Sequence, residues 1–482
     1  MIKRRILTTL TASLFLASPC LIQAQDAKKE TESKTKKLPS AADQIKDLSS
    51  LPDFTKQLQQ TIDQSGGNLA FVKTGIYRIT QPLIFDLTKH GAAKVTGSAG
   101  VTLIMDGPGP ALKFVGSHQG TASPKSFQTK TWDERMPIVS GIEIIGNHPE
   151  AVGIELFQTM EPIISRVSVR WCLHGIRLAT RNRNVTISDC HLYENSGVGI
   201  YLDDVNLHQI NVSNCHISYN RQGGIVVRDG NVRNLQITGC DIEGNMPGEH
   251  VPTKAANILL DVSATAGDKK HSIAEVTITS CTIQHSANYS DIKGKYSAVG
   301  GANIRILGKE SWPINSVTIT GNVISDTENN IDITHAYDVT INSNALFAPS
   351  SNHLLVKNSE RIVVSGNSFN PRQFERPAAL IFTDSKDCVL SSSTIHAAKN
   401  PAGAVQLNNC SNMLLSALNL TENAVGISLN KTDGATISNC RISRTLEGGA
   451  DIIIGADNKN IQLSGNAFSG KSDIDTAAKL KK

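Results

Sequence analysis

Val185-Thr186-Ile187-Ser188-Asp189-Cys190-His191-Leu192 is the stretch of sequence that decides the fold, because variants of it recur along most of the chain. Each copy is an alternating aliphatic run, then Cys or Asn, one further residue, and an aliphatic or aromatic residue. Later copies place the Cys or Asn at Cys215, Cys240, Cys281, Asn322, Asn344, Asn367, Cys440 and Asn466. The interval is mostly about 22 to 26 residues, and such a period indicates a solenoid, because one repeat must stack on its neighbours to bury its apolar face.

Each repeat carries a second strand, which reads Gly175-Ile176-Arg177-Leu178 in one copy and Asn257-Ile258-Leu259-Leu260 in another. The initial Gly or Asn suits a turn that needs unusual backbone angles. Both strands alternate aliphatic with polar residues, and helical periodicity is almost absent between Val95 and Phe468. We therefore expect an all-β chain that forms a single right-handed parallel β-helix, with about 22 or more residues and up to three strands in each coil.

The inward residues of the repeat are expected to form ladders inside the coils. Asn195, Asn220 and Asn245 recur at one register, which predicts side-chain amides that hydrogen-bond from coil to coil. Most of the nine cysteines lie in the repeats. Stacked strands lie about 4.8 Å apart, but their parallel Cβ directions do not favour disulfide geometry. Buried free thiols are the preferred interpretation, with disulfides in an oxidising compartment as the alternative.

The N-terminal residues predict export of the protein. Basic residues at positions 3–5 precede the apolar run 6–22, a pattern typical of a secretory signal peptide. No later stretch is long and apolar enough to predict a membrane span, and no basic cluster interleaved with aromatic residues favours nucleic acid. We therefore expect a secreted or periplasmic protein. The expected divisions are a signal peptide at 1–24, a disordered linker at 25–50, the β-helix domain at 51–472 and a C-terminal tail or cap at 473–482.

The start of the repeat domain carries further motifs. An amphipathic segment, Phe54–Gln64, follows the potential N-cap Asp53 and predicts a helix. It is followed by Gly66-Gly67 and by Gly75-Ile76-Tyr77-Arg78-Ile79. Together with the repeats, this order resembles the pectate lyase-like right-handed parallel β-helix superfamily (PbH1-type repeats). The resemblance implies an N-terminal capping helix. It implies little about chemistry, because the superfamily contains lyases, hydrolases, epimerases, tailspikes and non-enzymatic coils.

Strand alternation assigns the side chains that face outward on the Gly-Ile-x-Leu strands. The Arg of an R-I-K phrase on this strand type lines the substrate groove of polygalacturonase-like members of the superfamily. The remaining polygalacturonase motifs are missing from this chain. The candidate catalytic residues are Arg177, Tyr201, Asp203, Arg228 and Asp261. The candidate substrate-binding residues are Glu155, Arg305, Asp332 and His250, the last from a long insertion. Such insertions, at 246–256, 262–272 and 285–302, often wall a binding groove.

These residues support two mechanisms. In β-elimination on a uronate polymer, an arginine would neutralise the carboxylate while Tyr201 or His250 acts as acid or base. Asp203 and Asp261, with Asp332, could instead hold a calcium ion; no other cofactor is indicated. For hydrolysis, Asp203 and Asp261 lie two coils apart, about 9 to 10 Å, near the upper limit for an inverting glycosidase. The alternative is that Asp203, Arg228 and Asp261 simply pair their charges along a solvated sheet.

A second set, His191, His216 and Asp241, faces outward one residue after the ladder cysteines and suggests either a transition-metal site or stacked surface polar groups. We expect an exported carbohydrate-active protein that acts on a polysaccharide, with a polysaccharide lyase or related glycan-cleaving enzyme as the leading form. The alternatives are a non-catalytic polysaccharide-binding protein and a NosD-like periplasmic accessory protein. The sequence does not indicate an oligomeric state.

Overall fold

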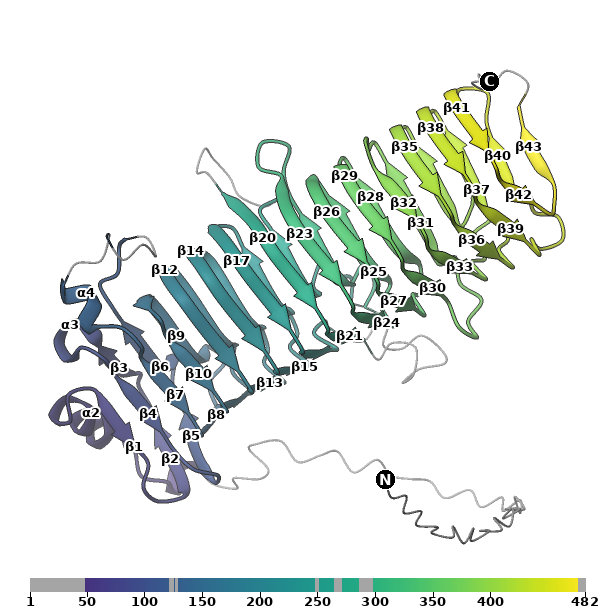
Figure 1. Ribbon diagram of the computed structural model, residues 1–482. Helices are drawn as coiled ribbons and strands as arrows, with labels where there is room; N and C mark the ends of the chain where they lie inside the picture. Colours follow the sequence, from purple (N-terminus) through teal and green to yellow (C-terminus); the bar gives the residue numbers. More distant parts are fainter. Residues whose placement is uncertain are drawn as a thin grey trace, which may run out of the picture. The chain divides into compact units, whose positions relative to one another are not determined.

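The chain forms a parallel β-solenoid of about 15 turns, built from a 28-stranded and a 15-stranded sheet. The structure is a computed structural model and describes residues 48–120, 125, 129–247, 251–263, 271–285 and 298–475. The expected signal peptide and most of the expected linker lie outside the described residues. Each regular coil contributes three strands that pair in parallel with their equivalents in the coils before and after, as expected (Figure 1).

Short helices gather at the N-terminal end. Helix α2 (Thr55–Gln64) buries Leu58 and Ile62, and begins one residue after the start expected from the sequence. The carboxylate of Asp53 accepts the backbone N–H of Thr55 at 2.9 Å, which stabilises this first turn. The other helices are η1 (Leu48–Ser50), α3 (Leu87–His90) and α4 (Thr129–Asp133). None of the helices in the described part of the chain is long and apolar enough to cross a membrane.

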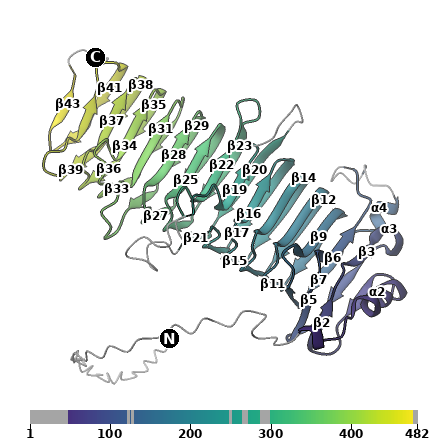
Figure 2. The same cartoon turned by 180° about the vertical axis from the view of Figure 1, so that it is seen from behind.

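The first side of the coil carries the Gly-Ile-x-Leu strands; Figure 2 labels β16, β19, β22 and β25 on it. Its strands are β3 (Leu83–Asp86), β6 (Gly109–Val115), β9 (Ala151–Met160), β12 (His174–Ser188), β14 (Val198–Ser213), β16 (Gly223–Arg228), β19 (Ala256–Asp261), β22 (Ala302–Leu307), β25 (Asn329–Thr334), β28 (Asn352–Lys357), β31 (Ala379–Thr383), β34 (Val405–Asn408), β37 (Ile427–Asn430), β40 (Ile452–Ile454) and β43 (Ser472–Ile474).

The second side carries the Val-Thr-Ile strands, and β12 and β14 continue onto it through a bend. Its other strands are β1 (Asn68–Ala70), β4 (Lys94–Thr96), β7 (Ile138–Ser140), β10 (Ile163–Ser165), β17 (Asn231–Thr238), β20 (Ser272–Thr279), β23 (Ile314–Thr320), β26 (Ala336–Asn342), β29 (Glu360–Ser365), β32 (Val389–Ser391), β35 (Ser411–Ser416), β38 (Asp433–Ser438) and β41 (Lys459–Ser464).

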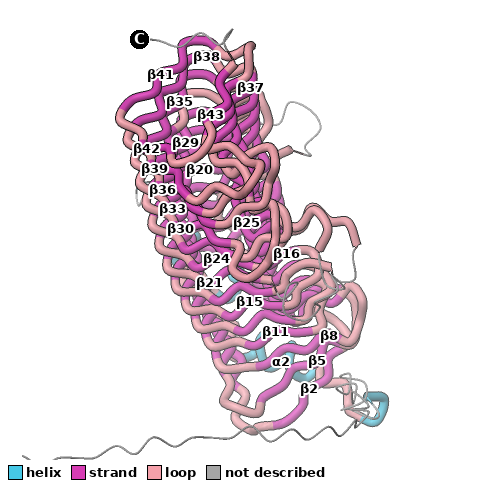
Figure 3. The backbone as a smooth tube through the Cα atoms, turned by 90° about the vertical axis from the view of Figure 1, so that its right-hand side faces the viewer, coloured by secondary structure: helices cyan, strands magenta, loops and turns pink. Residues whose placement is uncertain are grey.

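The third side is the 15-stranded sheet of short strands; β30, β33, β36, β39 and β42 follow one another along one edge in Figure 3. Its strands are β2 (Gly75–Ile79), β5 (Val101–Met105), β8 (Glu143–Gly146), β11 (Ser168–Arg170), β13 (His191–Tyr193), β15 (His216–Ser218), β18 (Asp241–Glu243), β21 (Thr282–Gln284), β24 (Val323–Ser325), β27 (Ala345–Phe347), β30 (Ser368–Asn370), β33 (Thr394–His396), β36 (Asn419–Thr421), β39 (Arg441–Ser443) and β42 (Ala467–Phe468).

Two ladders of inward residues run through the core, as the repeat phrase predicts. Cys190, Cys215, Cys240 and Cys281 are buried free thiols at successive coils, and the ladder continues with Asn322. Burial raises the pKa of the Cys172 thiol to about 12, which keeps it protonated and unreactive. The eight cysteines in the described part of the chain are all free, which confirms the expectation of buried thiols.

The asparagine ladder explains why some Gly-Ile-x-Leu strands start with Gly and others with Asn. The Asn195 amide donates to Asn220 at 2.8 Å, and Asn220 donates to Asn245 at 2.7 Å. A Cβ at Gly224 would lie only 2.9 Å from the Asn245 amide nitrogen. Where the ladder asparagine comes from the preceding turn, the start of the strand must therefore be Gly. The ladder then passes from Asn245 to Asn257, which is the second residue of β19. The predicted ladder is confirmed and extends further than expected.

Candidate functional site

The predicted outward residues lie in register on neighbouring strands of the first side. Arg177 pairs with Glu155 and Tyr201, and Asp203 pairs with Arg228, which pairs with Asp261. We call the charged outward residues of β6 to β25 on this side, together with Tyr201, the charged column: Lys113, Glu155, Arg177, Tyr201, Asp203, Arg228, Asp261, Arg305 and Asp332. The structure thus brings together the residues that the sequence singled out, apart from His250, which lies outside the described residues.

Charges at the N-terminal end of the charged column satisfy one another. Arg177 Nη1 lies 2.8 Å from Glu155 Oε2, and its Nε and Nη2 lie 2.9 and 2.6 Å from Asp203 Oδ2. Lys113 Nζ lies 2.9 Å from the other oxygen of Glu155. Glu155 is only 5% exposed, so its negative charge depends on these partners. An arginine already held between two carboxylates has little left to offer the carboxylate of a substrate.

Tyr201 lies against His174, with ring centroids 4.9 Å apart. Burial and the Asp203 carboxylate raise the pKa of Tyr201 to about 12, and burial lowers the pKa of His174 to about 4. At neutral pH both side chains are therefore uncharged. Tyr201 in this environment can donate a proton, but very little of it exists as the phenolate that a general base requires.

The central part of the charged column is also paired. Arg228 Nη1 lies 3.7 Å from Asp261 Oδ2, and Asp261 accepts hydrogen bonds from the backbone and hydroxyl of Ser263 at 2.8 and 2.6 Å. Arg228 lies between Asp203 and Asp261 in the column. A guanidinium at this position does not fit a calcium site made of these carboxylates. Asp332 is bound to Arg305 Nε at 2.8 Å.

The insertions cover part of the charged column. Arg305 is 5% exposed, and its Nη2 donates to the backbone carbonyl of Gly300. Within the described parts of the insertions, Thr253 N–H donates to the carbonyl of Val299 at 2.8 Å. The outward residue Leu259 is buried and packs with other apolar residues of this face. Around Leu259 the sheet is a covered surface.

The histidine pair at the third side is a surface feature. The rings of His191 and His216 stack with centroids 4.7 Å apart, and His216 Nδ1 lies 3.4 Å from Asp241 Oδ2. The His216 and Asp241 side chains are 57% and 41% exposed. Nowhere in the described parts of the chain do three or more His, Cys, Asp or Glu side chains come together as metal ligands.

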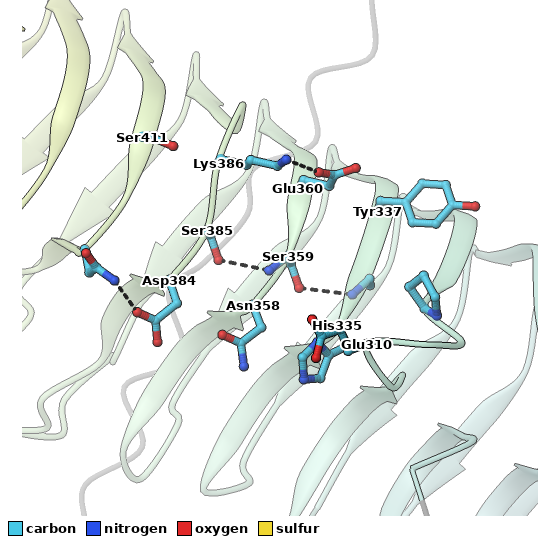
Figure 4. Close-up of a pocket in the computed structure, with 13 residues that line it drawn as sticks. Glu310, His335, Tyr337, Asn358, Ser359, Glu360, Asp384, Ser385, Lys386 and Ser411 are labelled. Carbon is cyan, nitrogen blue, oxygen red and sulfur yellow. Dashed lines mark hydrogen bonds and ion pairs between the residues drawn. The ribbon is translucent and has the colours of Figure 1, made fainter. Parts of the chain in front are cut away.

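A groove of about 790 Å³ lies elsewhere, along the bend between the first and second sides, and we call it the corner groove. One row of its residues takes the left-handed conformation directly after each first-side strand, and the other row lies at or close to the start of each second-side strand. Figure 4 shows the two rows on either side of the buried Ser359 and Ser385. The first row is His335, Asn358, Asp384 and Asn409, the second is Tyr337, Glu360, Lys386 and Ser411, and Glu310 lines the groove from a turn.

The corner groove combines paired and unpaired groups. Lys386 Nζ lies 2.9 Å from Glu360, and these contacts together with Arg361 hold the pKa of Glu360 below its usual range. Asn409 donates to Asp384 at 2.7 Å. Among the polar side chains that line the groove, those of His335, Tyr337, Asn358, Ser411 and Glu310 have no hydrogen-bond or ion-pair partner in the described structure. The groove thus presents a free imidazole, amide, phenol, hydroxyl and carboxylate.

None of these groove residues was predicted as a site residue, because they lie on the bend that follows the Gly-Ile-x-Leu strands and not on the strands themselves. A signal was present: Asn358-Ser359, Asp384-Ser385 and Asn409-Cys410 repeat a left-handed residue followed by a small inward one. Ser359 Oγ accepts the backbone N–H of Ala336 at 3.1 Å, and Ser385 Oγ accepts that of Ser359 at 3.3 Å. These bonds fix the spacing of the two rows.

Comparisons with known families agree with this fold. Residues 133–266 match the family model described as "Right handed beta helix region", and residues 275–480 match the one described as "Periplasmic copper-binding protein (NosD)". A search of curated proteins found no match.

Two of the solved structures with the same fold come from bacteriophages. Tailspike protein 3 of bacteriophage CBA120 is 11% identical, with a TM-score of 0.51, over 86% of this chain and 59% of the tailspike. The N-terminal fragment of gene product 12 of bacteriophage Phi29 is 12% identical, with a TM-score of 0.52, over 89% of this chain and 70% of that fragment. The likeness concerns the fold alone, and this chain spans less than two thirds of the tailspike. The repeat phrase, the parallel coils and the match of residues 133–266 to the right-handed β-helix model show that the chain has the right-handed parallel β-helix fold.

Proposed function

We propose that this protein is exported and binds a polysaccharide in the corner groove. The single observation that carries the proposal is the groove itself, which is about 790 Å³ and offers unpaired polar side chains from successive coils. A row with one polar group per coil repeats about every 4.8 Å, a spacing comparable to one sugar unit. A chain of sugars running along the solenoid axis would therefore meet an equivalent group at each coil.

The residue types of the corner groove fit sugar recognition. Asn358 and Ser411 can each donate and accept hydrogen bonds, as a sugar hydroxyl requires. Tyr337 is half-buried, and aromatic rings commonly anchor a ligand through a large rigid surface. The groove carries both signs of charge, at Glu310 and Lys386, so we expect a neutral or mixed-charge glycan there. Export is supported by the basic and apolar N-terminal pattern and by the likeness to a periplasmic family model.

The test is a binding screen followed by variants. The full chain is titrated with soluble oligosaccharides of neutral, uronate-containing and amino-sugar types, and the best ligand is used to compare Tyr337→Ala and Asn358→Ala with the unchanged protein. Tyr219→Ala is the matched control, since Tyr219 is half exposed at the bend after β15, outside the groove. Weaker binding by both groove variants and unchanged binding by the control support the proposal. Equal binding by all the variants would remove it.

A second candidate is a polysaccharide lyase that uses the charged column. It is favoured by the convergence of Arg177, Tyr201, Asp203, Arg228 and Asp261 on neighbouring strands in register. Tyr201 would protonate the leaving glycosidic oxygen, and the neighbouring Asp203 carboxylate would take the proton from the sugar carbon. Incubation with uronate polymers should then produce unsaturated ends that absorb in the ultraviolet, and Tyr201→Phe should abolish them. Since the described residues assemble no group of metal ligands, we propose neither a calcium nor a copper site for this chain.

A further inference from the structure

A third polar surface lies on the second side of the coil, on β12, β14 and β17, outside both the charged column and the corner groove. Its columns run in register across these three strands, with Arg183 beside His208 and His208 beside Arg233. We call it the arginine–amide face. It consists of Arg181, Arg183, Asn184, Thr186, Asn206, His208, Gln209, Asn211, Asn231, Arg233, Asn234 and Gln236. No position of this face is Asp or Glu.

Arg183 is the feature that sets this face apart. It is only 2% exposed and among the largest fully buried side chains of the described residues. Its Nη1 donates to the carbonyls of Asn182 and Asn206, its Nη2 donates to Asn206 Oδ1, and its Nε has no partner. Burial and the neighbouring Arg181 lower its pKa to about 10, which still leaves it charged at neutral pH. A buried charge is normally paired, because its desolvation is costly.

The positive charges of the neighbouring arginines are not balanced by carboxylates either. Across the described ranges of the chain, Arg181, Arg183 and Arg233 form no ion pair. Arg181 donates to the backbone carbonyl of Gly120, and Arg233 Nη2 donates to the Ser272 hydroxyl at 2.6 Å, so both meet neutral oxygens. Arg233 Nη1 and His208 Nε2 have no partner. The contrast with the charged column is direct, because there every arginine contacts a carboxylate.

Beside these cations lies a hollow of about 320 Å³ lined entirely by amide and hydroxyl side chains. Its residues are Asn184, Thr186, Gln209, Asn211, Asn234 and Gln236. Asn184 Oδ1 is buried without a hydrogen-bond partner, so the hollow offers an unused acceptor as well as donors. Groups of this kind can match the hydroxyls of a sugar ring, which donate and accept in turn.

Carboxylates bound the face in the neighbouring coils. Ile163 pairs with Thr186, which sets Glu161 beside Asn184 on one side, and Glu275 accepts from Asn234 at 2.6 Å on the other. The positive region is therefore limited to the coils of β12, β14 and β17, about 10 Å between the outer strands at 4.8 Å per coil. That length suits a short segment of a sugar chain with one anionic group near the middle.

We propose that the arginine–amide face is a binding site for an acidic saccharide, whose carboxylate or sulfate lies at Arg233 and His208 while its hydroxyls meet the amides of the hollow. Arg183 supplies a buried positive charge in the same column, where the low dielectric strengthens its attraction for an anion. We infer an acidic saccharide because the cations of this face have no carboxylate partner and because the amide surface beside them carries no Asp or Glu. This site uses residues separate from the corner groove, so either can fail without the other.

The experiment measures binding of the full chain to a uronate trisaccharide, a sulfated trisaccharide and a neutral trisaccharide of the same linkage. The acidic ligands should bind about tenfold or more tightly than the neutral one, and the preference should shrink when the ionic strength is raised. Arg233→Gln should remove most of this preference, and Gln236→Ala should weaken the binding of the acidic ligands. Arg233 is partly exposed, so these changes leave the core intact.

Arg444→Gln is the matched control, since Arg444 is an exposed arginine on a distant coil. This variant should bind each saccharide as tightly as the unchanged protein does. Tyr337→Ala should also leave acidic binding unchanged, which separates this site from the corner groove. Equal affinity for acidic and neutral ligands would overturn the proposal, as would the same loss in Arg444→Gln. Tighter binding of a single-stranded DNA oligonucleotide than of any saccharide would also overturn it, in favour of a nucleic-acid surface.

Discussion

The charged column and the corner groove are built on neighbouring parts of the same coils, and they differ in how their polar groups are used. In the column Arg177 contacts Glu155 and Asp203, and Arg305 contacts Asp332. In the groove His335 and Asn358 have no side-chain partner among the described residues. The column has more charge, but the groove has more unsatisfied hydrogen-bonding capacity. Unused donors and acceptors, more than charge, therefore mark the groove as the surface that is free to bind a ligand.

The largest expected effect concerns stability in the charged column. Arg177→Met would leave the buried Glu155 with Lys113 alone and Asp203 without its guanidinium. Because breaking a buried pair leaves an uncompensated charge, we expect a loss of about 3 kcal/mol. Denaturant unfolding followed by far-ultraviolet circular dichroism measures it.

The stability of Lys386→Met, a variant in the corner groove, is compared with that of Arg177→Met. The Lys386–Glu360 pair is largely exposed, and exposed pairs contribute about 0 to 1 kcal/mol. A loss in Lys386→Met as large as that in Arg177→Met would contradict the view that the column is structural and the groove is not.

The next effect concerns the interior beneath both regions, where the asparagine ladder reaches His353. Its Nδ1 lies 3.2 Å from the Asn330 amide, and burial lowers its pKa from 6.5 to about 3. The folded state keeps His353 neutral while the unfolded state binds a proton below pH 6.5, so stability is lost as the pH falls. Between pH 7 and pH 5 this histidine alone should cost about 2 kcal/mol.

His353→Asn is the matched variant, because asparagine occupies the equivalent ladder position at Asn330 and does not titrate. The unfolding midpoints of both proteins are compared at pH 7 and pH 5. The variant should lose less stability than the unchanged chain. Identical losses would show that His353 is not the group responsible.

A smaller effect is expected in the groove. Tyr337→Ala should weaken glycan binding about tenfold, which corresponds to about 1.4 kcal/mol, without altering the unfolding midpoint by more than about 0.5 kcal/mol. Isothermal titration measures the affinity. A large fall in stability with unchanged affinity would mean that Tyr337 is a packing residue, and the two regions would then not differ as described.

The smallest expected effect is the chemical labelling of the cysteines in the folded protein, which should be close to zero. The eight thiols of the described chain are buried, and burial raises the pKa of Cys388 to about 12. A thiol reagent added to the folded protein should therefore modify almost none of them, and denaturant should expose them all. Rapid labelling of the folded protein would show that the coils open on the time scale of the assay.

Much of the fold could be predicted because each coil repeats the same local rule. The Cys-or-Asn phrase marks an inward position, and strand alternation from it placed Arg177, Tyr201 and Asp203 on one outward face in the register observed. The amide ladder from Asn195 to Asn245 followed from the same spacing. These features depend on period and burial, which a single sequence displays directly.

The sequence predicted less well which polar side chains are paired and which are free, since this depends on the side chains that meet in three dimensions. The sequence suggested that Asp203, Arg228 and Asp261 pair with one another; Arg228 does contact Asp261, whereas Asp203 is held by Arg177. The corner groove and the unpaired Arg183 were both missed. Partner choice and the covering by insertions are properties of three-dimensional packing, and the repeat period carries no information about them.

The most direct test of the central claim is hydrogen–deuterium exchange of the full chain with and without the best-binding neutral oligosaccharide. Ligand should slow exchange in the peptides that carry residues 335–338, 358–361 and 384–387 and leave those that carry 177–179 and 201–203 unchanged. Protection confined to the second group, with none along the bend, would contradict the assignment of glycan binding to the corner groove.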